Sequence, residues 1–506
     1  MVTATDNRKI ASNTLVLYFR MLFKLLVTLY ITRVITNVLG VSDYGIYGVV
    51  GGVVTVMMFL NNAMTTSTLR FITFALGTKD TDYLGRVYSA GIIIHIVLAI
   101  FILIVGETLG LWYVIHQLNY PPERADAVFW VYQCSLFSAM LMILNVPFNS
   151  TIIAHERMTA FAVITILDIT LQLLVVLLLP HIGTDHLLAY AFMLLIVQVI
   201  VRIIYVLYCR YKFRDVHFSI HVGKKVFVKM LKFAGWSTFG NMALVCNTQG
   251  LNLVLNAFGG VVVNAAREIA FQVQAAVVSF IASFQTAVNP QITKNYAQKD
   301  LQATNDLILR SSRLSFILLY LMALPIMTET EMILQLWLKV VPSYAPIFTR
   351  LLLCVAMVDS IANPMMIGAS ATGNIKEYHL KVGGILLCAL PIAILVLKFG
   401  FPIVSVFIVL ILVVITAQIV RMYICRKLYQ FSFQRFYNEV IKKLVVVVLI
   451  STILPVLLHF IVPEGFWYSF FVCVVAVISV GVTSYFLGLT QTEQMFVKSK
   501  IPFMKK

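Results

Sequence analysis

The chain has few charged residues for its length. Charged residues make up 12% of the 506 residues, and only 21 are acidic against 38 lysines and arginines. Hydrophobic residues make up 60%, and the mean hydropathy is +0.93. A soluble chain of this size needs more polar surface than these residues supply. The composition therefore excludes a soluble globular protein and predicts a polytopic membrane protein.

Motifs for metal, redox or nucleotide chemistry are also absent. The seven cysteines occur singly, with no CxxC pair and no cluster of histidine and cysteine. We expect them to be small apolar core residues, and we expect no disulfide, metal or other cofactor. No GxxxxGK followed by Ser or Thr occurs, which argues against an ABC-type ATPase in this chain. The first apolar segment contains Arg20 and Lys24 and is too long for a signal peptide.

Apolar segments long enough to cross a hydrocarbon core of about 30 Å recur along the whole chain. They predict an all-α polytopic membrane protein with about fourteen transmembrane helices. The expected spans are 12–38, 44–69, 87–112, 127–150, 159–179, 187–208, 233–257, 261–289, 314–338, 345–369, 380–398, 401–423, 444–462 and 466–488. Because the number is even, both termini are expected on one side of the membrane.

Most of the cationic residues lie on alternate connections between these spans. This set comprises Arg8 and Lys9, Arg70 to Arg86, Arg157, Arg202 to Lys232, Lys294 to Arg313, Lys376 and Lys381, Arg421 to Lys443, and Lys498 to Lys506. Short cytoplasmic connections are enriched in Lys and Arg, so we expect both termini in the cytoplasm. The net charge of +17 then reflects orientation in the membrane, and no nucleic-acid partner is expected.

The second half of the chain repeats short features of the first. Asn37 and Gly40 recur as Asn256 and Gly259, and Lys79-Asp80 recurs as Lys299-Asp300 at nearly the same offset. A shared offset indicates duplication, and six spans per unit predict two parallel bundles related by pseudo-two-fold symmetry, with a substrate site at their interface. The expected parts are 1–208, an amphipathic cytoplasmic linker at 209–232, 233–424, and a helix pair with a basic tail at 425–506.

Four cationic residues lie within the first and eighth predicted spans. Arg20, Lys24 and Arg33 belong to the first span and Arg267 to the eighth. Ionisable groups at this depth either line an internal cavity or reach toward an interface, and both interpretations stay open for these residues. As cavity residues they would bind an anionic substrate, because guanidinium groups contact phosphate or diphosphate in a bidentate way.

Acidic and amide side chains supply further candidate sites. Asp168, Asp359 and Glu107 lie inside predicted spans, where each either forms a structural ion pair or takes up a proton or Na⁺ during coupled transport. Asn252 and Asn256 lie roughly on one stripe of the seventh span. Such a stripe suits either a substrate-binding cavity wall or hydrogen bonds between helices.

Several motifs resemble a known family. They are Leu-Gly-Val-Ser-Asp-Tyr-Gly-Ile-Tyr at 39–47, Phe-Ala-Gly-Trp at 233–236, Asn-Pro-Gln-Ile-Thr-Lys at 289–294 and Ala-Thr-Gly-Asn-Ile-Lys at 371–376. The chain resembles the polysaccharide-biosynthesis (O-antigen) flippases of the MOP, or MATE-like, superfamily. The resemblance implies transfer of an undecaprenyl-diphosphate-linked oligosaccharide across the bacterial inner membrane for O-antigen, capsule or exopolysaccharide assembly. The resemblance also implies that the protein acts together with glycosyltransferases and a polymerase of the same pathway.

Related lipid II flippases add expectations about individual residues. Their cavity is lined by arginines on the first and eighth helices, places that Arg20 and Arg267 match, with Lys24 as a second cation on the first helix. Their last two helices form a groove for the lipid tail, a role that the spans at 444–462 and 466–488 would take here. Some relatives bind Na⁺ through aspartates on spans seven and eleven, but neither span here contains an acid. The coupling ion, a proton or Na⁺, therefore stays open.

Two alternative functions are weighed against the flippase. An ion-coupled multidrug exporter of the MATE type would share the fold, but a cavity carrying Arg20, Lys24 and Arg267 repels its usual cationic substrates. A membrane-embedded glycan polymerase or ligase needs a sizeable outer domain, whereas the longest outer connection runs only from about Tyr113 to Asp126. We therefore expect a transporter and not an enzyme.

Overall fold

The computed structural model describes most of the chain as two compact units. It covers residues 4–57, 59–116, 121–213, 218, 223–338, 341–461 and 465–500. Side chains at 4–12, at scattered positions between 29 and 63, at 240–249, at scattered positions between 252 and 268 and near the end of the last helix lie outside this description. The N-terminal unit is Thr3–Thr238 and the C-terminal unit is Phe239–Lys506.

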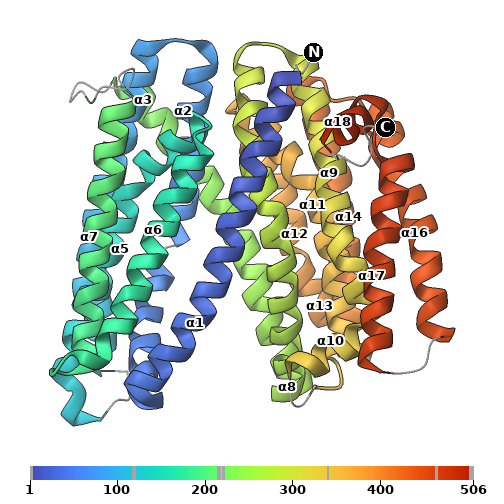
Figure 1. Cartoon of the computed structure of the whole chain (residues 1–506). Coiled ribbons are helices and arrows are strands. Elements are labelled where there is room, and N and C mark those ends of the chain that lie inside the picture. The colour runs from blue at the N-terminus through green and yellow to red at the C-terminus, as the bar shows by residue number, and fades with distance from the viewer. Residues whose placement is uncertain are drawn as a thin grey trace. The chain divides into compact units, whose positions relative to one another are not determined.

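The N-terminal unit is a bundle of antiparallel helices (Figure 1). Its α-helices are α1 (Ala4–Met57), α2 (Phe59–Thr78), α3 (Thr81–Val105), α4 (Leu111–His116), α5 (Ala125–Ala154), α6 (Met158–Leu178), α7 (His186–Lys212) and the start of α8 (Lys224–Ala297). Short π and 3₁₀ segments follow as η1 (Gly106–Gly110), η2 (Pro122–Arg124) and η3 (Leu179–His181). Helix α5 packs on α2, α3 and α7, while α6 packs on α1 and α7.

The C-terminal unit contains the rest of α8 and the helices that follow it. They are α9 (Leu301–Thr328), α10 (Thr330–Trp337), α11 (Ala345–Thr372), α12 (Lys376–Leu387), α13 (Ala389–Lys398), α14 (Ser405–Tyr429), α15 (Phe433–Phe436), η4 (Tyr437–Ile441), α16 (Lys442–Ile461), α17 (Phe466–Thr483), η5 (Ser484–Gly488) and α18 (Gln491–Lys500). Helix α11 packs between α9 and α14, and the last pair, α16 and α17, packs on α9.

Eleven helices of the described part are long and apolar enough to cross a membrane. They match expected spans three to six and eight to fourteen, so the chain is a multi-pass membrane protein. No strand occurs among the residues that the structure describes. The other three expected spans, 12–38, 44–69 and 233–257, lie in α1, α2 and α8, where many side chains are outside the description.

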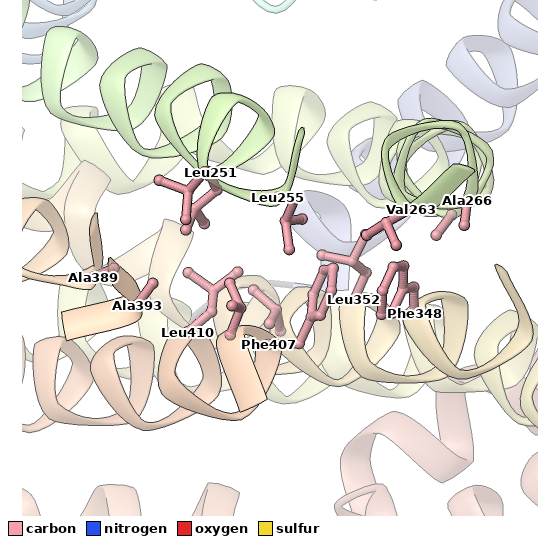
Figure 2. Packing of buried hydrophobic residues seen from close by; sticks show 14 of the residues in the cluster. Leu251, Leu255, Val263, Ala266, Phe348, Leu352, Ala389, Ala393, Phe407 and Leu410 are labelled. Atoms are coloured by element: carbon pink, nitrogen blue, oxygen red, sulfur yellow. The ribbon is translucent and has the colours of Figure 1, made fainter. Parts of the chain in front are cut away.

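Two turns expected from the sequence are helical in the structure. Helix α1 continues through 39–43, and α8 continues through 258–260 over 74 residues. In lipid no water competes for backbone hydrogen bonds, so glycine-containing segments keep their helical pairing. Helix α8 nevertheless bends. In Figure 2 the turns with Leu251 and Leu255 run across the view, whereas those with Val263 and Ala266 are seen end-on. Gly259 lets the Ile403 side chain pack closely against α8, since a Cβ at this position would lie 2.7 Å from Ile403 Cδ1.

The repeated Lys-Asp motif has the same local structure in both units. Lys79 and Lys299 adopt left-handed backbone with φ of 57° and 61°. Asp80 then caps α3 by accepting from the Tyr83 N–H, and Asp300 caps α9 by accepting from the Ala303 N–H, each at 2.8 Å. Residues with shared sequence therefore end one helix and start the next in the same way at both places.

Loss of either cap should destabilise the helix that it starts. We expect Asp80→Ala and Asp300→Ala each to lower the free energy of unfolding in detergent by about 1 kcal/mol, because an N–H of the first turn loses its acceptor. Gln298→Ala, at an exposed position beside the same turn, is the matched control and should change stability by less than about 0.5 kcal/mol. Denaturation curves that are equal for all three variants would contradict the capping role.

Several cations assigned by sequence to cytoplasmic connections lie inside helices. Arg70 is 7% exposed, with its guanidinium 4.5, 4.9 and 5.5 Å from the ring centres of Phe71, Phe74 and Phe233. Arg202 lies 4.3 Å over Phe148, and Arg313 and Arg421 are 2% and 6% exposed. Arg202 and Arg421 lie inside expected spans, and Arg70 and Arg313 lie one residue outside one, so all four belong to helices and not to connections.

Helix α18 is attached to the C-terminal unit by a buried carboxylate. Both Glu493 oxygens accept from Arg313 Nη2, at 2.8 and 2.7 Å, and Arg310 Nε lies 3.0 Å from Glu493 Oε1. Burial alone would raise the pKa of Glu493, but the charge of Arg313, the N–H of Thr490 and the charge of Arg310 outweigh it, and the pKa lies below its ordinary value. This attachment therefore requires an ionised Glu493.

Neutralising Glu493 should release α18. Removing one partner of a buried ion cluster costs about 3 kcal/mol or more, so Glu493→Gln should raise hydrogen exchange in α18 by about two decades. In the unchanged protein the attachment should persist at neutral pH and weaken as the pH falls below the ordinary glutamate value, because the folded pKa is the lower one. Glu439→Gln removes a half-exposed pair with Arg435 and should cost less than about 1 kcal/mol. Equal exchange in both variants would contradict the anchoring role.

Candidate functional site

A cavity of about 470 Å³ lies inside the C-terminal unit. Its walls come from α8, α11, α12 and α14, and most of the lining is apolar. Leu251, Leu255, Leu352, Phe407 and Leu410 line it and also belong to the hydrophobic core that joins these helices (Figure 2). The volume is in the range of small-ligand sites, in which a few polar groups on an apolar wall set the specificity.

Three charged side chains line this cavity. Arg267 comes from α8, Asp359 from α11 and Arg421 from α14, so they are far apart in sequence. Two guanidinium groups and one carboxylate leave a net positive charge. Within apolar walls such a charge attracts an anion more strongly than it would in water.

Arg421 is held in place by polar contacts to two helices. Its Nε donates to the Tyr378 hydroxyl at 2.7 Å, and its Nη1 donates to Gln418 Oε1. The Gln418 amide in turn contacts Met365 Sδ at 3.2 Å. Arg421 is also within electrostatic range of Asp359, whose side chain is accessible in the cavity. The guanidinium therefore has a fixed position in the wall of the cavity that Asp359 also lines.

Arg267 has a different surrounding. Its side chain is 7% exposed, and its guanidinium lies 5.8 Å from the ring centre of Phe271. Nearby, Gln274 Nε2 donates to the Leu352 carbonyl at 2.9 Å, and Asn363 Oδ1 has no hydrogen-bond partner among the described residues. Arg267, Gln274 and Asn363 thus supply donor and acceptor groups along the same cavity.

The N-terminal unit holds a second group of charged residues, on α1 and α6. Arg20 lies 4.4 Å over the ring of Phe161, and its Nε finds no hydrogen-bond partner in the part of the chain that is described. Asp168 accepts from Gln172 Nε2 at 2.9 Å and interacts electrostatically with Lys24. The structure therefore places Arg20, Lys24 and Asp168 on two helices that pack together, with Lys24 exposed.

The remaining predicted site residues have other positions. Glu107 lies in η1 and accepts from Gln133 Nε2 of α5 at 3.1 Å, and no contact joins it to Asp168 or Lys24 among the described residues. The side chains of Arg33, Asn252 and Asn256 lie outside the described ones, so their roles stay predictions.

Sequence reasoning missed Arg421 and Tyr378 as site residues. Arg421 was counted with a cytoplasmic connection, although it lies inside the expected span 401–423, three residues after Gln418. A glutamine and an arginine three apart inside an apolar span lie on one helix face, and this spacing was the available signal. Tyr378 gave no signal, because its position follows a turn and its partner is 43 residues away.

Comparison with solved structures gives the fold. A multidrug resistance MATE family transporter of the MOP superfamily, in an outward-facing conformation, matches with a TM-score of 0.70 at 14% identity. A MATE in the straight conformation matches with a TM-score of 0.70 at 15% identity, and a MOP superfamily transporter from Pyrococcus furiosus with 0.66 at 15%. Each match covers 83% of this chain and 95% of the other.

The chain has the fold of the MATE transporters. No family model and no curated protein sequence matches it. At 14 to 15% identity the likeness to MATE structures establishes the fold alone. The substrate must be inferred from the residues that line the cavities.

Proposed function

We propose that this chain is a flippase that moves an undecaprenyl-diphosphate-linked oligosaccharide from the inner to the outer leaflet of the bacterial cytoplasmic membrane, with both termini in the cytoplasm. The observation that carries the proposal is the pair of arginines, Arg267 and Arg421, in one cavity with a single carboxylate. A diphosphate offers oxygens to both guanidinium groups and offsets their charge. Arg20 and Lys24 add cations in the other unit.

A multidrug exporter is the second candidate, because transporters of that kind share the fold. The Pyrococcus furiosus transporter is described as having a binding pocket of reverse polarity that suggests a different function. Pocket polarity therefore differs among proteins of this fold. The cations Arg267 and Arg421 favour an anionic substrate here and oppose binding of a lipophilic cation.

Asp359 is the proposed ion-coupling residue. It is the one carboxylate among the residues that line the cavity, and it is accessible there beside Arg421. Uptake of a proton or Na⁺ by this group makes the net charge of the cavity more positive. Binding of the ion therefore changes the affinity of the cavity for the diphosphate, and binding of the diphosphate changes the affinity for the ion. Asp168, beside Lys24, is the corresponding candidate in the N-terminal unit.

Deletion of the chain should separate the two candidate functions. We expect deletion cells to lose their surface glycan and to accumulate lipid-linked oligosaccharide on the inner leaflet, whereas their resistance to lipophilic cations stays unchanged. Measurements are glycan display, protection of the lipid-linked glycan from an external glycosidase, and growth with ethidium. Complementation by the unchanged chain is the control. Normal display combined with ethidium sensitivity would favour the multidrug exporter.

A further inference from the structure

A second and larger cavity lies at one end of the C-terminal unit. Its volume is about 920 Å³, and its walls come from Glu329 between α9 and α10, from α10 and α11, and from the facing ends of α16 and α17. In Figure 1, α10 and these ends of α16 and α17 lie opposite the end that carries α18. By the charge distribution of the connections, this end is the one expected to face outward.

Two carboxylates face this cavity, each in contact with a basic side chain. Glu329 Oε1 lies 2.7 Å from His459 Nδ1, and the Glu329 side chain is only 6% exposed. Glu331 Oε2 accepts from Arg350 Nη2 at 2.6 Å, and Arg350 Nε donates to the Met327 carbonyl at 2.9 Å. Two carboxylates thus meet one guanidinium and one imidazole, unlike the two guanidinium groups and one carboxylate of the arginine cavity described above. This set offers hydrogen bonds without attracting a strongly anionic ligand.

Neutral polar and aromatic groups complete the lining. Gln335 supplies an amide, Ser469 a hydroxyl, and Tyr468 a hydroxyl on an aromatic ring. Sugar hydroxyls both donate and accept, so carboxylates, guanidinium, imidazole and amide groups can pair with them at once. The apolar faces of sugar rings pack on aromatic side chains such as Tyr468. The volume also lies within the range of about 300–1,000 Å³ of ligand sites.

We propose that this cavity binds sugars of the transported lipid-linked oligosaccharide, an inference that rests on the proposed flippase function. A diphosphate does not suit it, because Glu329 and Glu331 would repel the phosphate oxygens. The adjoining helix α16 carries exposed Leu449, Ile453 and Leu457, which contact lipid in a membrane. A glycan joined to a lipid tail can therefore place its sugars in the cavity while the tail stays in the hydrocarbon layer.

The test measures binding of the glycan without its lipid. The probe is the free oligosaccharide released by mild acid from the cell's own lipid-linked glycan, added to the purified full-length chain in detergent and followed by saturation-transfer NMR. We expect Ser469→Trp, which fills the cavity, and Glu329→Gln, which removes a buried charge, each to weaken binding at least tenfold. Phe470→Trp, one residue further along α17 and outside the lining, is the matched control and should bind normally.

Three results would overturn the inference. The first is absence of glycan binding by the unchanged chain. The second is equal binding by Ser469→Trp and Phe470→Trp. The third is binding of dihexanoylphosphatidylethanolamine but not of the glycan, which would indicate a site for a phospholipid headgroup. Failure of the proposed function is separate, because it appears as normal glycan display in deletion cells. If display requires the chain but the chain binds no free glycan, only the inference about this cavity fails.

Discussion

Replacing Arg421 by leucine is expected to reduce transport by about 10- to 100-fold. The change leaves Asp359 in the cavity without the nearby cation, and it leaves the Tyr378 hydroxyl and the Gln418 amide oxygen without their donor. One charge-assisted contact to the diphosphate is worth about 1.5–3 kcal/mol, which corresponds to about one to two decades. The measurement is the rate at which lipid-linked glycan reaches the outer leaflet of cells that express equal amounts of protein.

A double variant distinguishes a structural role of Arg421 from a role in transport. Replacing Asp359 and Arg421 together by leucine removes both charges, so thermal stability in detergent should recover part of what Arg421→Leu loses. The rest stays lost, because Tyr378 and Gln418 remain without their donor. Transport should stay lost, because the cavity then has one cation fewer and no titratable carboxylate. Recovery of transport together with stability would show that the pair serves folding alone.

Replacing Arg267 by alanine should abolish glycan display while the protein still reaches the membrane. One charge-assisted contact to the diphosphate is worth about 1.5–3 kcal/mol, so affinity should fall by about one to two decades. Arg267→Lys should recover only part of the affinity, since an ammonium group cannot contact two phosphate oxygens at once as the planar guanidinium does. Binding of farnesyl diphosphate to the purified protein measures the affinity, and complementation measures the display.

The matched control for Arg267 is Arg426→Ala. Arg426 lies on α14 with its guanidinium 5.7 Å from the ring centre of Phe433, is exposed, and is not among the residues that line the cavity. Arg426→Ala removes the same charge from the same unit as Arg267→Ala, and its affinity for farnesyl diphosphate should stay within about twofold of that of the unchanged protein. Equal loss in both variants would mean that net charge, and not the cavity, governs binding. Unchanged binding in Arg267→Ala would remove the main support for an anionic substrate.

Much of the fold could be predicted because hydropathy is a local property. A span is recognised from about 20 consecutive residues, whatever the rest of the chain does, and eleven of the expected spans are matched by helices. The Lys79-Asp80 and Lys299-Asp300 turns were equally predictable, since an aspartate cap acts within four residues. The bend of α8 was not, because whether a glycine ends a helix or bends it depends on the neighbouring helices and on the lack of competing water.

The candidate site was predictable only in part. Arg267 and Asp359 were identified because a charge inside an apolar segment is costly wherever the segment packs. Their partners were not identifiable, because Arg421, Tyr378 and Asp359 come from three helices and their distances depend on how each helix is rotated. The cavity with Glu329 and His459 gave no sequence signal, since these residues lie 130 positions apart.

The sequence by itself determined that this protein spans a membrane many times, that its halves share short motifs, and that charges lie within its spans, since each is a property of nearby residues. Only the tertiary structure decided which charges share a cavity, which cations counted as surface groups are buried, and where two carboxylates meet a histidine and an arginine. The physical reason is that a buried charge is stabilised by partners from other helices, and helix packing, which no local pattern records, selects those partners.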